Sequence, residues 1–133
     1  MFNKVESAEH AFSIVGFTPD LKKFKKLGLP ERYVQPLFDG FVLELVVEAN
    51  NKINGDWKAD WNNGKQRKFS VWNYVVKDES KPAGFGLADT GYAYWSSVTN
   101  VGERLLVGSS EQALYLGNEF KPLFESHQLI IRK

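Results

Sequence analysis

The 133-residue sequence contains no cysteine, which excludes disulfides, thiolate metal sites and a cysteine nucleophile. It has no stretch approaching ~18 consecutive apolar residues, and charged residues interrupt the N-terminus where a signal peptide requires an apolar segment. The formal net charge is only +1, so the overall charge predicts no attraction to nucleic acid or to an anionic membrane. These absences predict a soluble, cytoplasmic protein that makes no membrane contact.

Aromatic residues, by contrast, are abundant. The chain has four Trp, five Tyr and ten Phe, or 14% of all residues, and large rings are costly to leave in water unless they line a core or meet a partner. The apolar and charged fractions, 43% and 25%, are those of an ordinary globular protein. We therefore expect a single domain over residues 1–133 with a large core, an exposed aromatic surface that binds a partner, or both.

The first 50 residues have the periodicity and punctuation of helices. Ser7 is placed to cap a short helix that Gly16 would end. Thr18 and Pro19 mark the start of a second helix that closes at Gly28. Apolar residues then recur at three- and four-residue spacing from Glu31 to about Asn50, which predicts the central helix. A proline at position 36 favours a regular part that begins there.

The second half of the sequence switches to strands and ends in a helix. Aromatic and β-branched residues predict strands at Phe69–Val76, near Phe85–Tyr94 and at Arg104–Val107. A capping box at Ser109–Gln112 begins the last helix, which Pro122 should kink or shorten. The predicted fold is α+β: N-terminal helices, a three-stranded antiparallel meander, and a C-terminal helix packed on one face.

The most informative segment is the polar stretch GDWKADWNNGKQRK and the strand that follows it. Here rings alternate with cations, as in platforms that stack exposed bases while contacting phosphates. The predicted contact residues for single-stranded nucleic acid or a protein partner are Trp57, Lys58, Trp61, Lys65, Arg67, Lys68 and Trp72, with Phe69 and Tyr74 nearby. The alternative is that the indoles are core residues and the lysines only solvate a loop.

Other groups carry less chemical information. Four lysines around Phe24 would extend the basic surface if their helix lies beside the Trp-rich segment. Oxygen side chains between residues 56 and 63 do not match calcium-loop spacing and indicate turns. His10 and His127 lie at opposite ends of the chain, so histidine catalysis and zinc are not expected. We predict no metal and no cofactor.

Four blocks of the sequence, DWKADWNNGKQRKFSVW, KPAGFG, VGERLLVGSSEQALYLGNEF and LFESHQLI, resemble a family of small proteins from gut bacteria and their bacteriophages. The resemblance covers roughly residues 31–130 and implies a mobile-element setting, which places the protein in the host cytoplasm if it is phage-encoded. Ser70 and Val71 depart from the family pattern, where relatives tend to have tyrosine and proline. The resemblance implies no activity, cofactor or functional residue.

Taken together, these features predict a non-enzymatic accessory binding protein of a phage or mobile element. Its Trp-rich basic loop would contact single-stranded nucleic acid or a partner protein. One alternative is a virion or assembly protein whose exposed rings become buried in a homo-oligomer. A second is an enzyme that uses carboxylates such as Asp56, Asp60 or Asp89.

Overall fold

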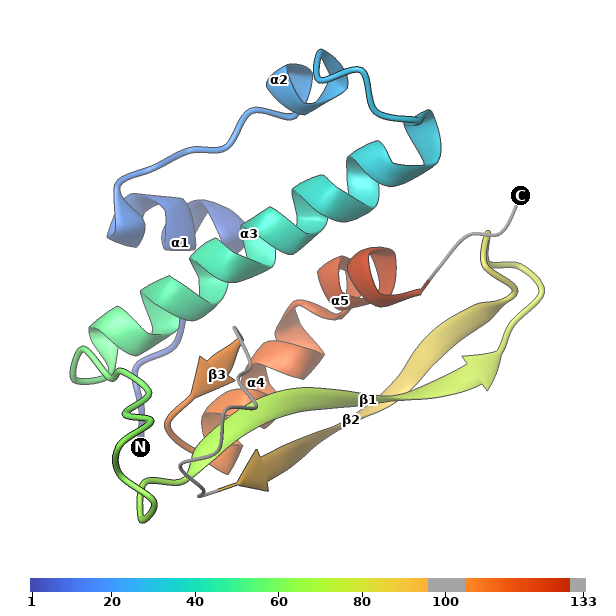
Figure 1. Ribbon diagram of the computed structural model, residues 1–133. Coiled ribbons are helices and arrows are strands. Elements are labelled where there is room, and N and C mark those ends of the chain that lie inside the picture. The colour runs from blue at the N-terminus through green and yellow to red at the C-terminus, as the bar shows by residue number, and fades with distance from the viewer. Residues whose placement is uncertain (96–104, 130–133) are drawn as a thin grey trace.

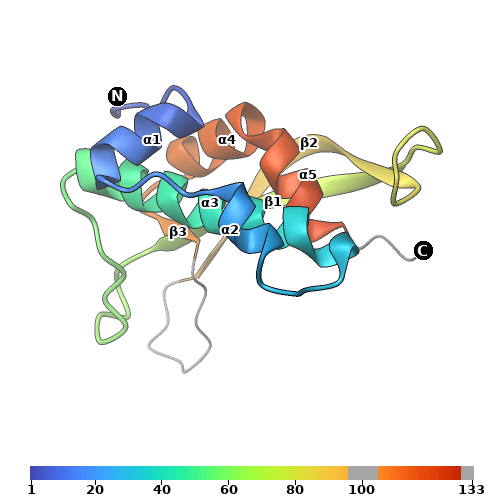
Figure 2. The ribbon, with the colours of Figure 1, turned by 90° about the horizontal axis from the view of Figure 1, so that it is seen from above.

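A computed structural model describes residues 1–95 and 105–129. The protein has the predicted α+β fold, with helices on one side of a small antiparallel sheet (Figures 1 and 2). Its elements are α1 (Ala8–Val15), α2 (Leu21–Lys25), α3 (Glu31–Ile53), β1 (Lys68–Lys77), β2 (Phe85–Trp95), β3 (Leu106–Val107), α4 (Ser110–Glu119) and α5 (Lys121–Gln128).

The strand order is β2-β1-β3, so the predicted meander order is wrong. In a meander β2 would be the central strand, whereas here β1 is central and β3 pairs with its second edge, Phe69 opposite Val107. A long-range contact explains the difference: the side-chain amide of Asn51, near the end of α3, donates to the Leu106 carbonyl at 2.8 Å. This contact and the burial of Leu106 and Val107 hold β3 beside β1 and close to α3.

The N-terminal helices follow the capping signals predicted for α1, whereas α2 ends at Lys25, before the predicted Gly28, and the start signals of α2 and α3 also need correction. The Ser7 hydroxyl accepts from the His10 amide at 3.0 Å, and Gly16 ends α1 with φ +83°. Helix α2 is capped by Asp20 instead of Thr18, because the Asp20 carboxylate accepts from the Lys22 amide at 2.9 Å. Helix α3 already begins at Glu31 and includes Pro36 near its start, where the proline removes one backbone donor without ending the helix.

The predicted C-terminal helix is divided into two. Helix α4 ends at Glu119 with Phe120 as its C-cap, and Pro122 lies in the first turn of α5, where its missing N–H costs no intrahelical hydrogen bond. Helix α4 packs on β1 and β2, whereas α5 packs mainly on α3. The expected interruption at Pro122 is therefore confirmed, and it lets one segment cover two surfaces.

A single cluster of buried apolar side chains joins every described element except α2. Its members include Val5, Ala11, Leu43, Val46, Phe69, Leu87, Val107, Leu116 and Phe124. None of the helices within the described ranges combines the length and the apolar character needed to cross a membrane.

Candidate partner-binding surface

The segment of residues 56–67, called here the Trp loop, is closed on itself by side chains that bond to the backbone. The Asp60 carboxylate accepts from the Asn62 amide at 3.0 Å, and the Asn63 side chain accepts from the Lys65 amide at 2.9 Å. The Gln66 side chain accepts from the Asp60 amide at 2.7 Å and donates to the Lys58 carbonyl at 3.0 Å. The turn-forming role predicted for Asp60 and Asn63 is confirmed.

Lys68, predicted as a surface contact, is fully buried. Its ammonium donates to the carbonyls of Gln66 and Asn63 at 3.1 and 3.4 Å and lies 5.1 Å from the ring centroid of the half-buried Trp61. A buried cation needs such partners to offset the loss of its hydration. Lys68 therefore holds the base of the Trp loop together and does not face solvent, because the tight loop draws its side chain inward.

Trp57 is half-buried against the chain between β3 and α4. A Cβ atom at Gly108 would lie 3.0 Å from its Cδ1 and 3.1 Å from its Nε1, so the indole fits only because position 108 has no side chain. The Trp57 amide also donates to the Asn51 carbonyl at 3.0 Å. This indole anchors the Trp loop to the body of the protein.

The remaining cations of the predicted site do not form a continuous track. The Lys58 ammonium lies 3.4 Å from the Asp56 carboxylate, both of them exposed, and such pairs neutralise charge while contributing little stability. The guanidinium of Arg67 lies 5.4 Å from the ring centroid of Tyr94. Lys65 is exposed.

The lysine cluster of α2 is separate from the Trp loop. Phe24 packs against Phe38 and Phe41 with centroid distances of 5.3 and 6.0 Å, so α2 lies on the first half of α3. The Trp loop follows the other end of this helix of 23 residues, which is about 34 Å long (Figure 1). The four lysines are exposed and form a solvated face.

Trp72 differs from the other two indoles, because it is 52% exposed on the sheet face that the helices leave uncovered. Its neighbour Val71 points to the helices, where a Cβ at Gly117 would come within 2.8 Å of its Cγ1. Side chains alternate along a strand, so Trp72 points to the opposite side. Its ring lies 4.8 Å from that of Tyr74, which is also 52% exposed, and extends over Gly91 of the neighbouring strand.

The β1–β2 hairpin, residues 68–95, carries more exposed large apolar side chains than the sequence-based site included. Besides Trp72 they are Tyr74, Val75, Val76, Phe85, Tyr92 and Tyr94. The sequence of β1 contains a pattern that could have identified these residues. Apolar residues occupy successive positions, 71–72 and 74–76, so both faces of the strand carry apolar side chains. A strand with one solvated face normally alternates, so this pattern indicates a second covered or partner-seeking face.

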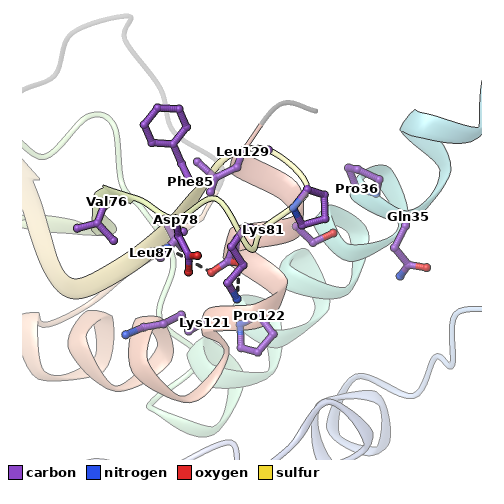
Figure 3. A pocket seen from close by; sticks show the side chains of 15 residues that line it. Gln35, Pro36, Val76, Asp78, Lys81, Phe85, Leu87, Lys121, Pro122 and Leu129 are labelled. Carbon is purple, nitrogen blue, oxygen red and sulfur yellow. Dashed lines mark hydrogen bonds and ion pairs between the residues drawn. The ribbon is translucent and has the colours of Figure 1, made fainter. Parts of the chain in front are cut away.

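A cavity of about 510 Å³ lies between the hairpin tip, the start of α3 and α5 (Figure 3). Its charged groups are already paired: the Lys81 ammonium lies 3.1 Å from the Glu125 carboxylate, which also accepts from the Leu87 amide at 3.2 Å. Hydrogen bonds from the hydroxyl and amide of Ser80 lower the pKa of Asp78. Asp56, Asp60 and Asp89 are exposed and do not line the cavity, which gives the carboxylate-enzyme alternative no support.

In the part of the chain that the structure describes, no three acidic or histidine side chains gather in an arrangement that could hold a metal ion. Comparisons with protein-family models, with curated proteins and with solved structures find no match to this chain. The exposed surface of the hairpin is therefore the feature of the described residues that best indicates a function.

Proposed function

We propose that this chain is a non-enzymatic accessory binding protein, in the mobile-element setting that its sequence resemblance implies. Its contact surface is the face of the hairpin that the described helices leave uncovered, called here the open face, with Trp72 and Tyr74 as anchors. Its partner is another protein. The observation that carries the proposal is a pair of adjacent aromatic rings, each 52% exposed, on a sheet face that no described helix covers. Exposed Trp and Tyr are the side chains most enriched among residues that dominate binding energy.

The charges beside these rings favour a protein partner over nucleic acid. Lys77 is paired with Glu79 at 3.4 Å and Lys81 with Glu125 at 3.1 Å, and Lys68 is buried. Arg67 stacks on Tyr94, which pairs with Phe69 and thus lies on the other face of the hairpin from Trp72. Single-stranded nucleic acid requires cations along the path of its phosphates, and no described unpaired cation accompanies Trp72 and Tyr74.

A photocrosslinking experiment tests the proposal. p-Benzoylphenylalanine replaces Tyr74 in one variant and Tyr33, which is 46% exposed on α3, in a matched control. In extracts of the organism that encodes the chain, we expect a protein adduct from position 74 that is absent from position 33. The adduct should disappear when Trp72→Ala is added.

A second measurement separates the two kinds of partner. A labelled single-stranded oligonucleotide is titrated with the protein at low salt and again at increasing salt, where phosphate contacts would weaken steeply. We expect no binding that depends on Trp72. Salt-sensitive binding that Trp72→Ala abolishes would replace the protein partner with nucleic acid, and adducts unaffected by Trp72→Ala would refute the proposed surface.

A further inference from the structure

The outer strand of the sheet, β2, has one edge that pairs with β1 and a second edge that faces away from the sheet. It has 11 residues, whereas β3, at the opposite edge, has only two. An unpaired edge presents a row of backbone donors and acceptors to any other extended chain. The groups that cover the outer edge of β2 therefore decide whether another strand can pair with it.

The first part of β2 is blocked by α5. The Leu87 amide donates to the Glu125 carboxylate at 3.2 Å, and the Ala88 carbonyl accepts from the Lys121 ammonium. The register with β1 then shifts, so that Ala88 and Asp89 together face Tyr74 as a bulge. Side-chain partners and a bulge are both devices by which proteins close an edge.

Beyond the bulge, no described residue bonds to the outer edge of β2, and this stretch is called here the open edge. Within residues 1–95 and 105–129, the backbone groups of Thr90–Tyr94 have no hydrogen-bond partner outside the ladder with β1. This stretch, Thr-Gly-Tyr-Ala-Tyr, contains neither charge nor proline, the usual protection of an exposed edge. Tyr92 and Tyr94 are 40% and 55% exposed. The same strand is thus closed at one end and unprotected at the other.

We infer that a second copy of this chain pairs with the open half of β2, antiparallel and about a two-fold axis near Tyr92, to make one continuous sheet. This register places Thr90 opposite Tyr94 of the second copy and Tyr92 opposite its equivalent, cross-strand pairs that stabilise sheets. Asp89 is the only charged residue of β2. The two copies of Asp89 would lie six positions apart, or about 20 Å, so they would not repel.

A second copy fits this edge better than a single extended segment. A lone strand would cover the edge of β2 but would itself become a new unprotected edge, whereas a second copy brings its own β1 and ends the sheet in its own two-residue β3. The open face would then present a strip of Gly91 and Ala93 from both copies between two copies of Trp72. The inference goes beyond the proposed function, because it concerns the edge of the sheet and not the partner bound on its face.

The first test is the mass of the full chain in solution by analytical ultracentrifugation over a range of concentrations. We expect a particle of twice the 15.2 kDa chain mass, and at least a tenfold weaker dimer when Ala93→Lys places a charge on the open edge. Val75→Lys is the matched control, because Val75 is 52% exposed but belongs to the central strand. It should leave the dimer intact, and circular dichroism verifies that both variants are folded.

A wild-type chain that stays monomeric at all concentrations would overturn the inference, as would a dimer that both lysine variants weaken equally.

A spin-label experiment locates the dimer contact. Because the chain has no cysteine, Asp89→Cys or Ser13→Cys introduces a unique labelling site. We expect labels at position 89 about 20 Å apart and labels at position 13, on α1, much farther apart; the reverse order would place the dimer contact elsewhere. Trp72→Ala should preserve the dimer while abolishing partner crosslinks. Loss of the dimer would therefore count against the edge pairing alone, and loss of the crosslinks bears only on the proposed partner-binding face.

Discussion

In the Trp loop both indoles are half-buried, and Lys68, the lysine that contacts Trp61 at the base of the loop, is inside the protein. In the β1–β2 hairpin, by contrast, Trp72 and Tyr74 are each 52% exposed. The two regions are adjacent in sequence and contain the same residue types. The Trp loop uses its rings and cation internally, since Trp57 packs on Gly108 and Trp61 stacks with Lys68. The hairpin has its helices on one face only, so its second face keeps its rings in solvent.

The difference follows from how each backbone satisfies its polar groups. An irregular loop must find partners for its amides and carbonyls, and here Lys68, Gln66 and the Asp and Asn side chains provide them, drawing the loop inward. A strand satisfies its backbone through its neighbours, so its side chains are free to point to either face. Clustered rings and cations in a sequence therefore indicate a binding surface only when something else stabilises the backbone that carries them.

The largest effect is expected where the hairpin packs on α4. A Cβ at Gly117 of α4 would collide with Thr90 and lie 2.8 Å from Val71 Cγ1, and both of these side chains are β-branched and stiff. We expect Gly117→Ala to lower the free energy of unfolding by about 3 kcal/mol, the upper end of the usual cost of overpacking. Urea unfolding followed by circular dichroism measures this change.

Gly91→Ala is the matched control for that substitution. It lies on the same hairpin but on the open face, where a Cβ would be 3.4 Å from the Trp72 ring, an ordinary contact. Its effect should stay within about 0.5 kcal/mol, as for most surface substitutions. Equal costs for the two alanines would mean that α4 does not hold the hairpin at Gly117.

The next effect tests the Trp loop. Lys68→Met keeps the apolar stem but leaves the Gln66 and Asn63 carbonyls and the Trp61 ring without the ammonium, and we expect a loss of about 1–2 kcal/mol in the free energy of unfolding. Amide exchange should accelerate across residues 56–67 more than in the hairpin. Lys65→Met, at an exposed position, should change neither quantity; a Lys68 variant that behaves like it would show that the buried ammonium does not organise the loop.

Local signals predicted most of the fold, and long-range contacts account for what they missed. The Ser7 and Ser109 caps, the Gly16 terminus and the break near Pro122 depend on residues within one or two helical turns of each other, so the sequence displays them directly. The strand order depends on Asn51 reaching Leu106, 55 residues away, and no local pattern reveals that contact. Of the candidate surface, the sequence identified Trp72 but also included Trp57 and Lys68, which are internal anchors of the Trp loop. Trp57 packs on Gly108 and Lys68 bonds to carbonyls of the loop, and no local pattern reveals either contact.

The smallest effect is expected at the hairpin tip, whose turn is stabilised by the Asp78 carboxylate in the same way as Asp60 stabilises a turn of the Trp loop. The Asp78 carboxylate accepts from the Ser80 hydroxyl at 2.6 Å and from its amide at 3.0 Å, and these bonds lower the pKa of Asp78 below its usual 3.8. Because the folded pKa is lowered, the stabilisation is present above pH 3.8 and is lost as the pH falls through the folded value. An NMR titration of the wild-type chain should thus give Asp78 a midpoint below 3.8.

Ser80→Ala removes the hydroxyl hydrogen bond, the largest cause of the lowered pKa of Asp78, and retains the amide. The midpoint should therefore rise toward 3.8 without returning fully to it, and the hairpin tip should become disordered at a higher pH than in the wild type. Ser13→Ala, at an exposed position of α1, should leave the midpoint unchanged. An unchanged midpoint in Ser80→Ala would mean that the hairpin tip, unlike the Trp loop, is not fastened by its side-chain hydrogen bonds.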